Sequence, residues 1–148
     1  MQEYERYVLE QYDIDVNSTH KIRGAVLCET DRGPFLLRET TTAPARLQAL
    51  CGLYEDLRRQ GYLNVDAVVP NKAGEYVTVL EDGGRYLLKR WFQGRECDLR
   101  RPAEILSASG NLAKLHLLLR SGEREGLTAA ESLEEEYRRH DRELKKVR

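Results

Sequence analysis

Side chains that serve as nucleophiles or metal ligands are few in this chain and lie far apart. Cys28, Cys51 and Cys97 form no CxxC pair, so the sequence indicates neither a disulfide framework nor a zinc site. The three histidines have no ligand-like spacing to one another or to the cysteines. We expect reduced thiols, with Cys28 and Cys51 as small buried apolar residues, and no structural metal.

Composition and charge exclude several classes of function. The 148 residues include 24 lysines and arginines against 25 aspartates and glutamates, and this balance argues against nucleic acid or an anionic membrane as a partner. A hydrophobic fraction of 41% fits one main core. No apolar run reaches the length of a membrane span, and residues 1–10 lack the apolar stretch of a signal peptide, so we predict a cytoplasmic protein.

Helical spacing at the start of the chain predicts a short packing helix that ends near Asp13. Its apolar stripe consists of Tyr4, Val8, Leu9 and Tyr12. From residue 17 to 39, β-branched and aliphatic residues are interrupted by Gly24 and by residues 31–33, which predicts three strands. The chain therefore opens with one helix, followed by three antiparallel strands.

A second helix is predicted at about residues 43–60, with Pro44 as a start signal and Gly61 as a stop. Its apolar positions are Leu47, Leu50, Tyr54 and Leu57. After it, residues 65–69 are predicted to form a short strand, and residues 76–80 and 86–92 a hairpin. These elements predict a five-stranded antiparallel sheet with the helix packed on one face.

The strand signals stop at Gln93 and Gly94, where we place a hinge between residues 1–93 and residues 94–148. A helix begins after the hinge with Pro102, because proline suits the first helical position. Its apolar positions are Ile105, Ala108, Leu112, Leu115 and Leu119. The second part of the chain is therefore expected to be helical.

The last helix is predicted to begin with a capping box from Thr128 to Glu131. No glycine, asparagine or proline precedes Arg148 as a stop, so we expect a truncated helical region, with a natural free helix end as the alternative. An apolar seam on this helix should dock on the missing part or on a second copy of the chain. The seam consists of Leu133, Tyr137, His140, Leu144 and Val147, beside the charge pairs Glu134/Arg138, Glu135/Arg139 and Asp141/Lys145.

The order of these elements resembles the aminoglycoside-phosphotransferase and choline-kinase-like superfamily, and within it the CotS-type spore coat proteins. The segments that carry the resemblance are EQYDIDV (10–16), TDRGPFLLRE (30–39), RQGYLNV (59–65), YLLKRWFQG (86–94) and LAKLH (112–116). The resemblance implies an α+β fold. Residues 1–93 would form a protein kinase-like N-lobe of five antiparallel strands and one helix, with an N-terminal helix. Residues 94–148 would form the hinge and the opening helices of a truncated C-lobe.

The resemblance also implies a nucleotide site. In such folds a lysine on the third strand grips the nucleotide phosphates and pairs with a helix glutamate. Here Arg38 occupies that position, and because its planar head does not reproduce a lysine contact, we expect weakened nucleotide binding. The alternative is that Arg38 is an ordinary exposed strand residue. Glu55 is the implied helix partner, with Asp56 as a competitor.

Two further segments are implied to contact the nucleotide. The loop over the phosphates would be residues 21–25, where Gly24 is the only glycine. Main-chain groups of residues 89–92 would bind the adenine edge, with Leu87 or Val26 as an apolar wall, unless these are ordinary core and strand residues. The nucleotide-binding residues predicted in this segment are Arg90, Trp91 and Phe92.

The superfamily's catalytic groups have no counterpart here. Phosphoryl transfer needs a catalytic-loop aspartate, an asparagine and a second acid that holds the metal, and no HGD-like or DWD-like motif follows His116. We therefore predict no catalytic and no metal-binding residue, and expect His116 to be a buried structural residue. ATP and magnesium are expected only in an intact protein.

These observations leave three functions to compare. The first is a spore coat-associated protein whose kinase-like fold is a non-catalytic scaffold, with other spore coat proteins as partners and deposition on the forespore coat. The second is the N-terminal fragment of an ATP-dependent small-molecule phosphotransferase. The third is a free-standing interaction module that uses the seam of the last helix.

Overall fold

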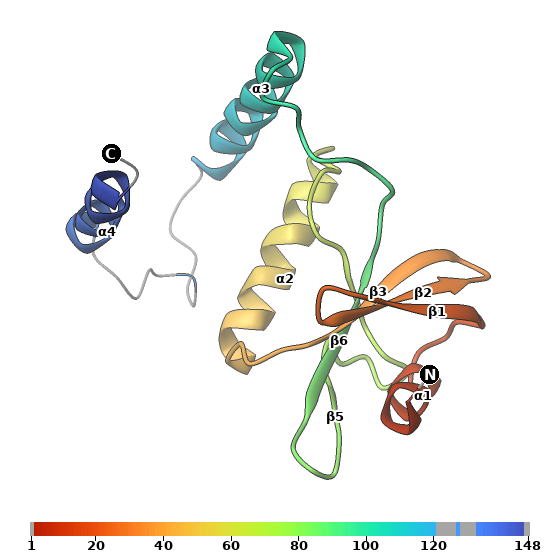
Figure 1. Cartoon of the computed structure of the whole chain (residues 1–148). Coiled ribbons are helices and arrows are strands. Elements are labelled where there is room, and N and C mark those ends of the chain that lie inside the picture. Colours follow the sequence, from red (N-terminus) through yellow and green to blue (C-terminus); the bar gives the residue numbers. More distant parts are fainter. Residues whose placement is uncertain (1, 121–126, 128–132, 147–148) are drawn as a thin grey trace.

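The structure is a computed structural model and describes residues 2–120, 127 and 133–146. Within these ranges the chain forms four helices and six strands (Figure 1). In chain order they are α1 (Glu3–Glu10), β1 (Val16–Ile22), β2 (Ala25–Thr30), β3 (Gly33–Glu39), α2 (Pro44–Arg59), β4 (Val68–Val69), β5 (Thr78–Val79), β6 (Arg85–Arg90), α3 (Pro102–Leu119) and α4 (Leu133–Lys146).

All strand pairs of the sheet are antiparallel, as predicted. The order is β1-β2-β3-β6-β4, and β5 also pairs with β6. Because β3 occupies one edge of β6, the other edge is divided between β4, opposite Leu88 and Lys89, and β5, opposite Arg85 and Tyr86. The predicted strands 65–69 and 76–80 are therefore only two residues long each, and six strands occupy five positions.

The turn between β1 and β2 has two residues, Arg23 and Gly24, both with positive φ (43° and 78°). Such a turn matches the right-handed twist of the flanking strands, and glycine adopts positive φ without strain. The prediction of three strands for residues 17–39 is confirmed by β1, β2 and β3.

Helix α1 covers one face of the sheet and forms the main core with it. Leu88 at the centre of β6 is fully buried there, between its register partners Leu37 on β3 and Val69 on β4. The buried members of this cluster are Val8, Leu9, Tyr12, Val26, Cys28, Phe35, Leu37 and Leu88. The predicted N-terminal helix thus packs through the expected stripe, except that Tyr4 at its start stays exposed.

Helix α2 packs against the opposite face, where its Leu47 and Cys51 form a cluster with Leu87 of β6 (Figure 1). It lies where predicted, with Ala43 and Gln60 as its flanking residues. Of the predicted stripe, Leu47 and Leu57 are buried, while Leu50 and Tyr54 are half-buried and line a cavity between α2 and the sheet. The stripe omitted Cys51, which is buried against the sheet, and Glu55, four positions further on, lines a second cavity on that side of α2.

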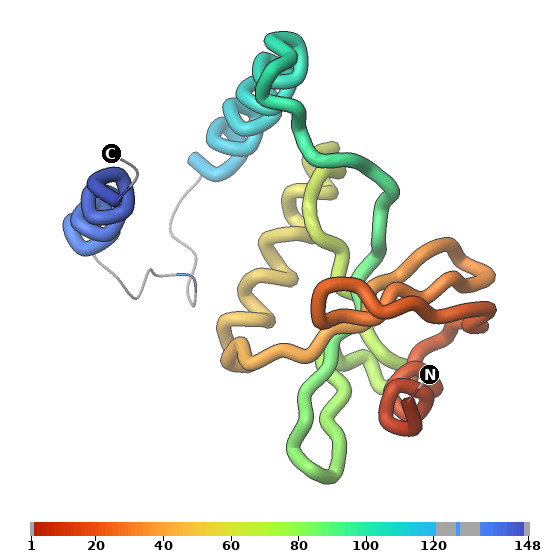
Figure 2. The backbone as a smooth tube through the Cα atoms, in the orientation of Figure 1, coloured from red at the N-terminus to blue at the C-terminus, as the bar shows by residue number. Residues whose placement is uncertain are grey.

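The chain leaves β6 through an extended segment, residues 91–101, and α3 stands away from the sheet (Figure 2). No residue of α3 is buried, so the prediction of a buried His116 is wrong: nothing in the described chain covers that turn. On α4 the seam residues Tyr137 and Leu144 are exposed. The predicted capping box and Val147 lie outside the described residues.

None of the helices within the described ranges is both long enough and apolar enough to cross a membrane. All three cysteines are free, with Cys28 and Cys51 buried and Cys97 exposed. The prediction that Cys28 and Cys51 are small core residues is therefore confirmed.

Candidate functional site

Two cations project from neighbouring strands into a cleft between the sheet and α2. In the register of β3 and β6, Arg38 lies opposite Leu87 and Leu36 lies opposite Lys89. Directly opposed residues share a face of a sheet, and so do residues two apart, so Arg38 and Lys89 are on the face that α2 covers. The cleft holds a cavity of about 290 Å³.

The two cations of the cleft differ in their partners. The Lys89 ammonium lies 2.9 Å from a carboxylate oxygen of Asp66, in the loop between α2 and β4, and the Lys89 side chain is only 19% exposed. Arg38 is exposed and has no carboxylate of the described residues within ion-pair distance. Only Lys89 is therefore fixed in place by an opposite charge.

Glu55 lines a second cavity, of about 240 Å³, next to the first. Its carboxylate accepts a hydrogen bond of 2.7 Å from the Tyr76 hydroxyl. Both cavities are lined by Tyr54, Asp66 and Val68, so these residues lie where the two cavities adjoin. The structure therefore does not bring Arg38 and Glu55 together, and the competing Asp56 forms an ion pair with Arg59.

From the hydrogen bond to Glu55 we predict a raised pKa for Tyr76. The bond stabilises the protonated phenol, and with burial it raises the pKa of Tyr76 to about 12, from an ordinary value near 10. Because the folded-state pKa is raised, the stability that this bond contributes is complete below about pH 10 and is lost as the pH rises through about 12. Ultraviolet titration should show this tyrosine ionising late.

Glu55→Gln is the matched variant, since it keeps the shape of the side chain and removes its charge. The pKa of Tyr76 should then fall toward the ordinary range, while titration of the other tyrosines stays unchanged. Assignment of the signal comes from its loss in Tyr76→Phe. An unchanged titration in Glu55→Gln would show that the carboxylate does not set the pKa of Tyr76.

The residues predicted to contact the nucleotide from the loop and the hinge lie around the same sheet, but they differ in whether their main-chain groups are already hydrogen-bonded. Gly24 is in the tight turn, and its neighbour Arg23 forms an exposed ion pair with Glu96 at 3.6 Å, so this turn reaches the segment after β6. The amides of Arg90 and Trp91 already donate to main-chain oxygens within the chain. In the described residues, the main chain of Phe92 takes part in no main-chain hydrogen bond.

Side-chain positions place Arg90 beside a cavity and correct the apolar wall predicted at Val26. The Arg90 guanidinium lies 5.7 Å from the centre of the Phe35 ring, which belongs to the core under α1, and Arg90 also lines the cavity of about 240 Å³ beside the cleft. Val26 belongs to the same core, so it cannot be an apolar wall of the cleft. In the register of β2 and β3, Leu27 lies opposite Leu36, so Leu27 is the residue of this pair on the face that α2 covers. The prediction of Leu87 on the cleft face is correct.

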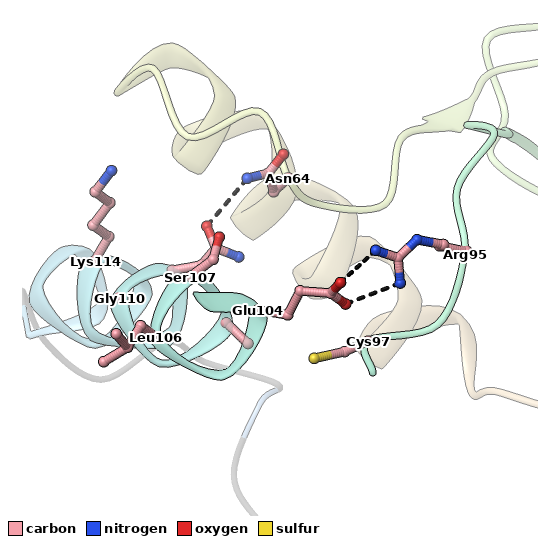
Figure 3. A pocket seen from close by; sticks show the side chains of 10 residues that line it. Asn64, Arg95, Cys97, Glu104, Leu106, Ser107, Gly110 and Lys114 are labelled. Carbon is pink, nitrogen blue, oxygen red and sulfur yellow. Dashed lines mark hydrogen bonds and ion pairs between the residues drawn. The ribbon is translucent and has the colours of Figure 1, made fainter. Parts of the chain in front are cut away.

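A larger and more open hollow of about 730 Å³ lies between α3 and residues 91–101, the segment where the hinge was predicted and which we call the hinge segment (Figure 3). There the Glu104 carboxylate accepts hydrogen bonds from both terminal nitrogens of Arg95 and, at 2.8 Å, from the Asp98 amide. The Arg95 guanidinium lowers the pKa of Glu104. These contacts fix the hinge segment to the start of α3, and Asn64 joins the middle of α3 through Asn111 at 3.1 Å.

Sequence reasoning missed three residues of the cleft, Tyr54, Asp66 and the Lys89 side chain. For Lys89 a signal existed, because alternation along residues 85–90 places positions 87 and 89 on one face. No cluster of three or more histidines, cysteines, aspartates or glutamates that could hold a metal ion occurs in the part of the chain that the structure describes.

No family model and no curated protein matches this sequence. The fold does match solved structures. An aminoglycoside phosphotransferase from Alicyclobacillus acidocaldarius superposes with a TM-score of 0.69 and 18% identity, over 78% of this chain and 35% of that one. A microcompartment-associated aminopropanol kinase superposes with a TM-score of 0.61 and 18% identity, over 88% of this chain and 44% of that one.

These similarities establish the fold class that was predicted. The chain is a mixed α+β protein with the N-lobe of a kinase-like fold, followed by the helices α3 and α4. It spans less than half the length of either solved relative. At 18% identity the likeness concerns the fold, and the resemblance to CotS-type spore coat proteins stays a prediction.

Proposed function

We propose that this chain is the nucleotide-side lobe of a kinase-like small-molecule phosphotransferase, and that it binds nucleotide phosphates in the cleft between the sheet and α2. The observation that carries the proposal is the position of Arg38 and Lys89 on one face of a kinase-like sheet, beside one cavity. Phosphoryl transfer by such folds depends mainly on positioned positive charge, because charge is spread over the phosphate oxygens.

Within this proposal the chain by itself does not transfer phosphate, and it binds ATP weakly. The sequence carries no catalytic-loop motif after His116, and the turn at Gly24 offers few free amides to a phosphate group. Carboxylates that would hold magnesium would come from a longer protein. We expect affinity in the millimolar range, which nuclear magnetic resonance (NMR) titration can measure.

Arg38→Met is expected to weaken ATP binding about tenfold or more, because a charge-assisted hydrogen bond contributes about 1.5–3 kcal/mol. The matched control is Arg59→Met, which removes an exposed arginine that pairs with Asp56 outside the cleft. The measurement is the dissociation constant from amide shifts of the whole chain titrated with ATP. Equal affinities for the wild type, Arg38→Met and Arg59→Met would overturn the assignment of Arg38.

A scaffold role in the spore coat is the second candidate. The observation that favours it is the Tyr76–Glu55 hydrogen bond, which occupies the carboxylate that a catalytically active arrangement would give to the β3 cation. Under this proposal the partners are other spore coat proteins, and the protein is deposited on the forespore coat. Co-purification of tagged protein from sporulating and vegetative cells separates this role from a cytoplasmic enzyme.

Self-association through α4 belongs to the same proposal. Tyr137 and Leu144 are 76% and 66% exposed on one helix, and unburied apolar stripes favour association. Leu144→Glu should shift the chain toward monomer in light scattering at several concentrations. The control is Glu143→Lys, one position away, which changes charge without touching the seam. A wild type that is monomeric at every concentration would refute self-association.

A further inference from the structure

We propose that Lys89, oriented by Asp66, is the main cation that contacts the nucleotide phosphates in the cleft, and that Arg38 is the second one. This inference rests on the proposed function, because it assigns a residue within the same site. In kinase-like folds the principal lysine lies on β3, but here that strand carries Arg38, and we assign the role to a lysine on β6. The carboxylate that orients this lysine is Asp66 in the loop before β4, and not a glutamate on α2.

The geometry of the sheet brings the Lys89 ammonium to the required place. Lys89 shares a face with Arg38 on the adjacent strand, and both line the cavity of about 290 Å³. Glu39, the other acid beside this cavity, lies opposite Tyr86 in the register, on the face that α1 covers. Among the described residues that line this cavity, the strands therefore present two cations on the cleft face, and the carboxylate that pairs with one of them is Asp66.

The contacts of Lys89 suit a preorganised phosphate ligand. An ammonium group has three donors, and one of them points to Asp66 at 2.9 Å. The side chain is 19% exposed, so little conformational freedom remains to be lost when an anion binds. A lysine also supplies the compact point charge that an arginine on β3 does not reproduce. Lys89 therefore supplies the lysine point charge that is missing on β3, where the sequence has Arg38.

Asp66 also explains why Glu55 is not needed as the partner of a cation. Tyr54 and Asp66 line both cavities, with Arg38 beside one and Glu55 beside the other. Glu55 is satisfied by Tyr76, and Lys89 is satisfied by Asp66. The site thus has one complete lysine–carboxylate pair, built from residues 23 positions apart in the sequence.

The test compares ATP with adenosine, which has the same base and sugar but no phosphate. Dissociation constants for both are measured by NMR on the full chain, for the wild type, Lys89→Met, Arg38→Met and Lys145→Met. Lys145 is the matched control, because it forms a lysine–aspartate pair with Asp141 on α4, at 2.7 Å and exposed. We expect Lys89→Met to lower the preference for ATP over adenosine about tenfold or more, and Lys145→Met to leave it unchanged.

Each outcome decides a different claim. If the wild type prefers ATP and only Arg38→Met reduces that preference, this inference is wrong and the proposed function stands. If the wild type binds ATP no better than adenosine, the proposed function fails, and the inference fails with it. A loss of affinity for adenosine equal to the loss for ATP in Lys89→Met would mark Lys89 as a structural residue only.

A second measurement does not depend on the folding of Lys89→Met. Reductive methylation with a carbon-13 label keeps the charge of each lysine and gives it an NMR signal, and the Lys89 signal is assigned by its absence in Lys89→Arg. This signal should shift with ATP and with inorganic triphosphate but not with adenosine. A Lys89 signal that stays still while amides of the cleft respond to ATP would overturn the inference.

Discussion

Replacing Leu88 by alanine is expected to lower the free energy of unfolding by about 2–5 kcal/mol. Leu88 is fully buried at the centre of β6, in the cluster that joins the sheet to α1. It lies between Leu37 and Val69 in the register, so the surrounding strands cannot move inward to fill the space left by its side chain. The loss is a large part of the stability of a small domain.

Leu63→Ala is the control, because Leu63 is 65% exposed and should change the stability by less than about 0.5 kcal/mol. Urea unfolding can be followed by the fluorescence of Trp91, the only tryptophan, which directly follows β6. The core assignment is wrong if the two variants unfold at the same urea concentration.

A thiol reagent is expected to modify Cys97 at least about a hundred times faster than Cys28 or Cys51. Burial raises the pKa of both buried thiols to about 11. At pH 8 about one such thiol in a thousand is ionised, against about a quarter for an ordinary exposed thiol. Cys28 and Cys51 are also 0% and 2% exposed, which blocks the reagent further.

Cysteine-to-serine variants assign each kinetic phase, and urea provides the control, because the three thiols should react at similar rates once the chain is unfolded. The rate for the buried thiols should rise about tenfold per pH unit between pH 8 and 10, as the thiolate fraction does. A Cys28 that reacts as fast as Cys97 in the native chain would mean that the α1 core opens freely.

The elements that the sequence predicted well are those whose signals are local. Helix α2 lies where Pro44 and Gly61 placed it, and Gly24 lies in the turn between the first two strands, where it was expected to interrupt them. Helical spacing likewise predicted α1 and the start of α3 at Pro102. Each of these signals spans only a few residues, so the prediction does not depend on contacts with distant parts of the chain.

The candidate site was predicted less well, because its contacts join residues far apart in the sequence. The Tyr76–Glu55 hydrogen bond spans 21 positions and the Lys89–Asp66 pair spans 23. The first depends on how α2 packs against the sheet, where the predicted apolar stripe omitted the buried Cys51, and the second depends on the path of the loop between α2 and β4. The shortened strands β4 and β5 have a similar cause, since they share one edge of β6.

The most direct test of the central claim is a map of the amides that respond to ATP in the wild-type chain. We predict shifts in β3 around Arg38, in β6 around Lys89, at Tyr54 on α2 and at Phe92 in the hinge segment, with smaller shifts for adenosine at Arg38 and Lys89. Shifts confined to the hollow between the hinge segment and α3, or to α1, would contradict the assignment of the cleft as the nucleotide site.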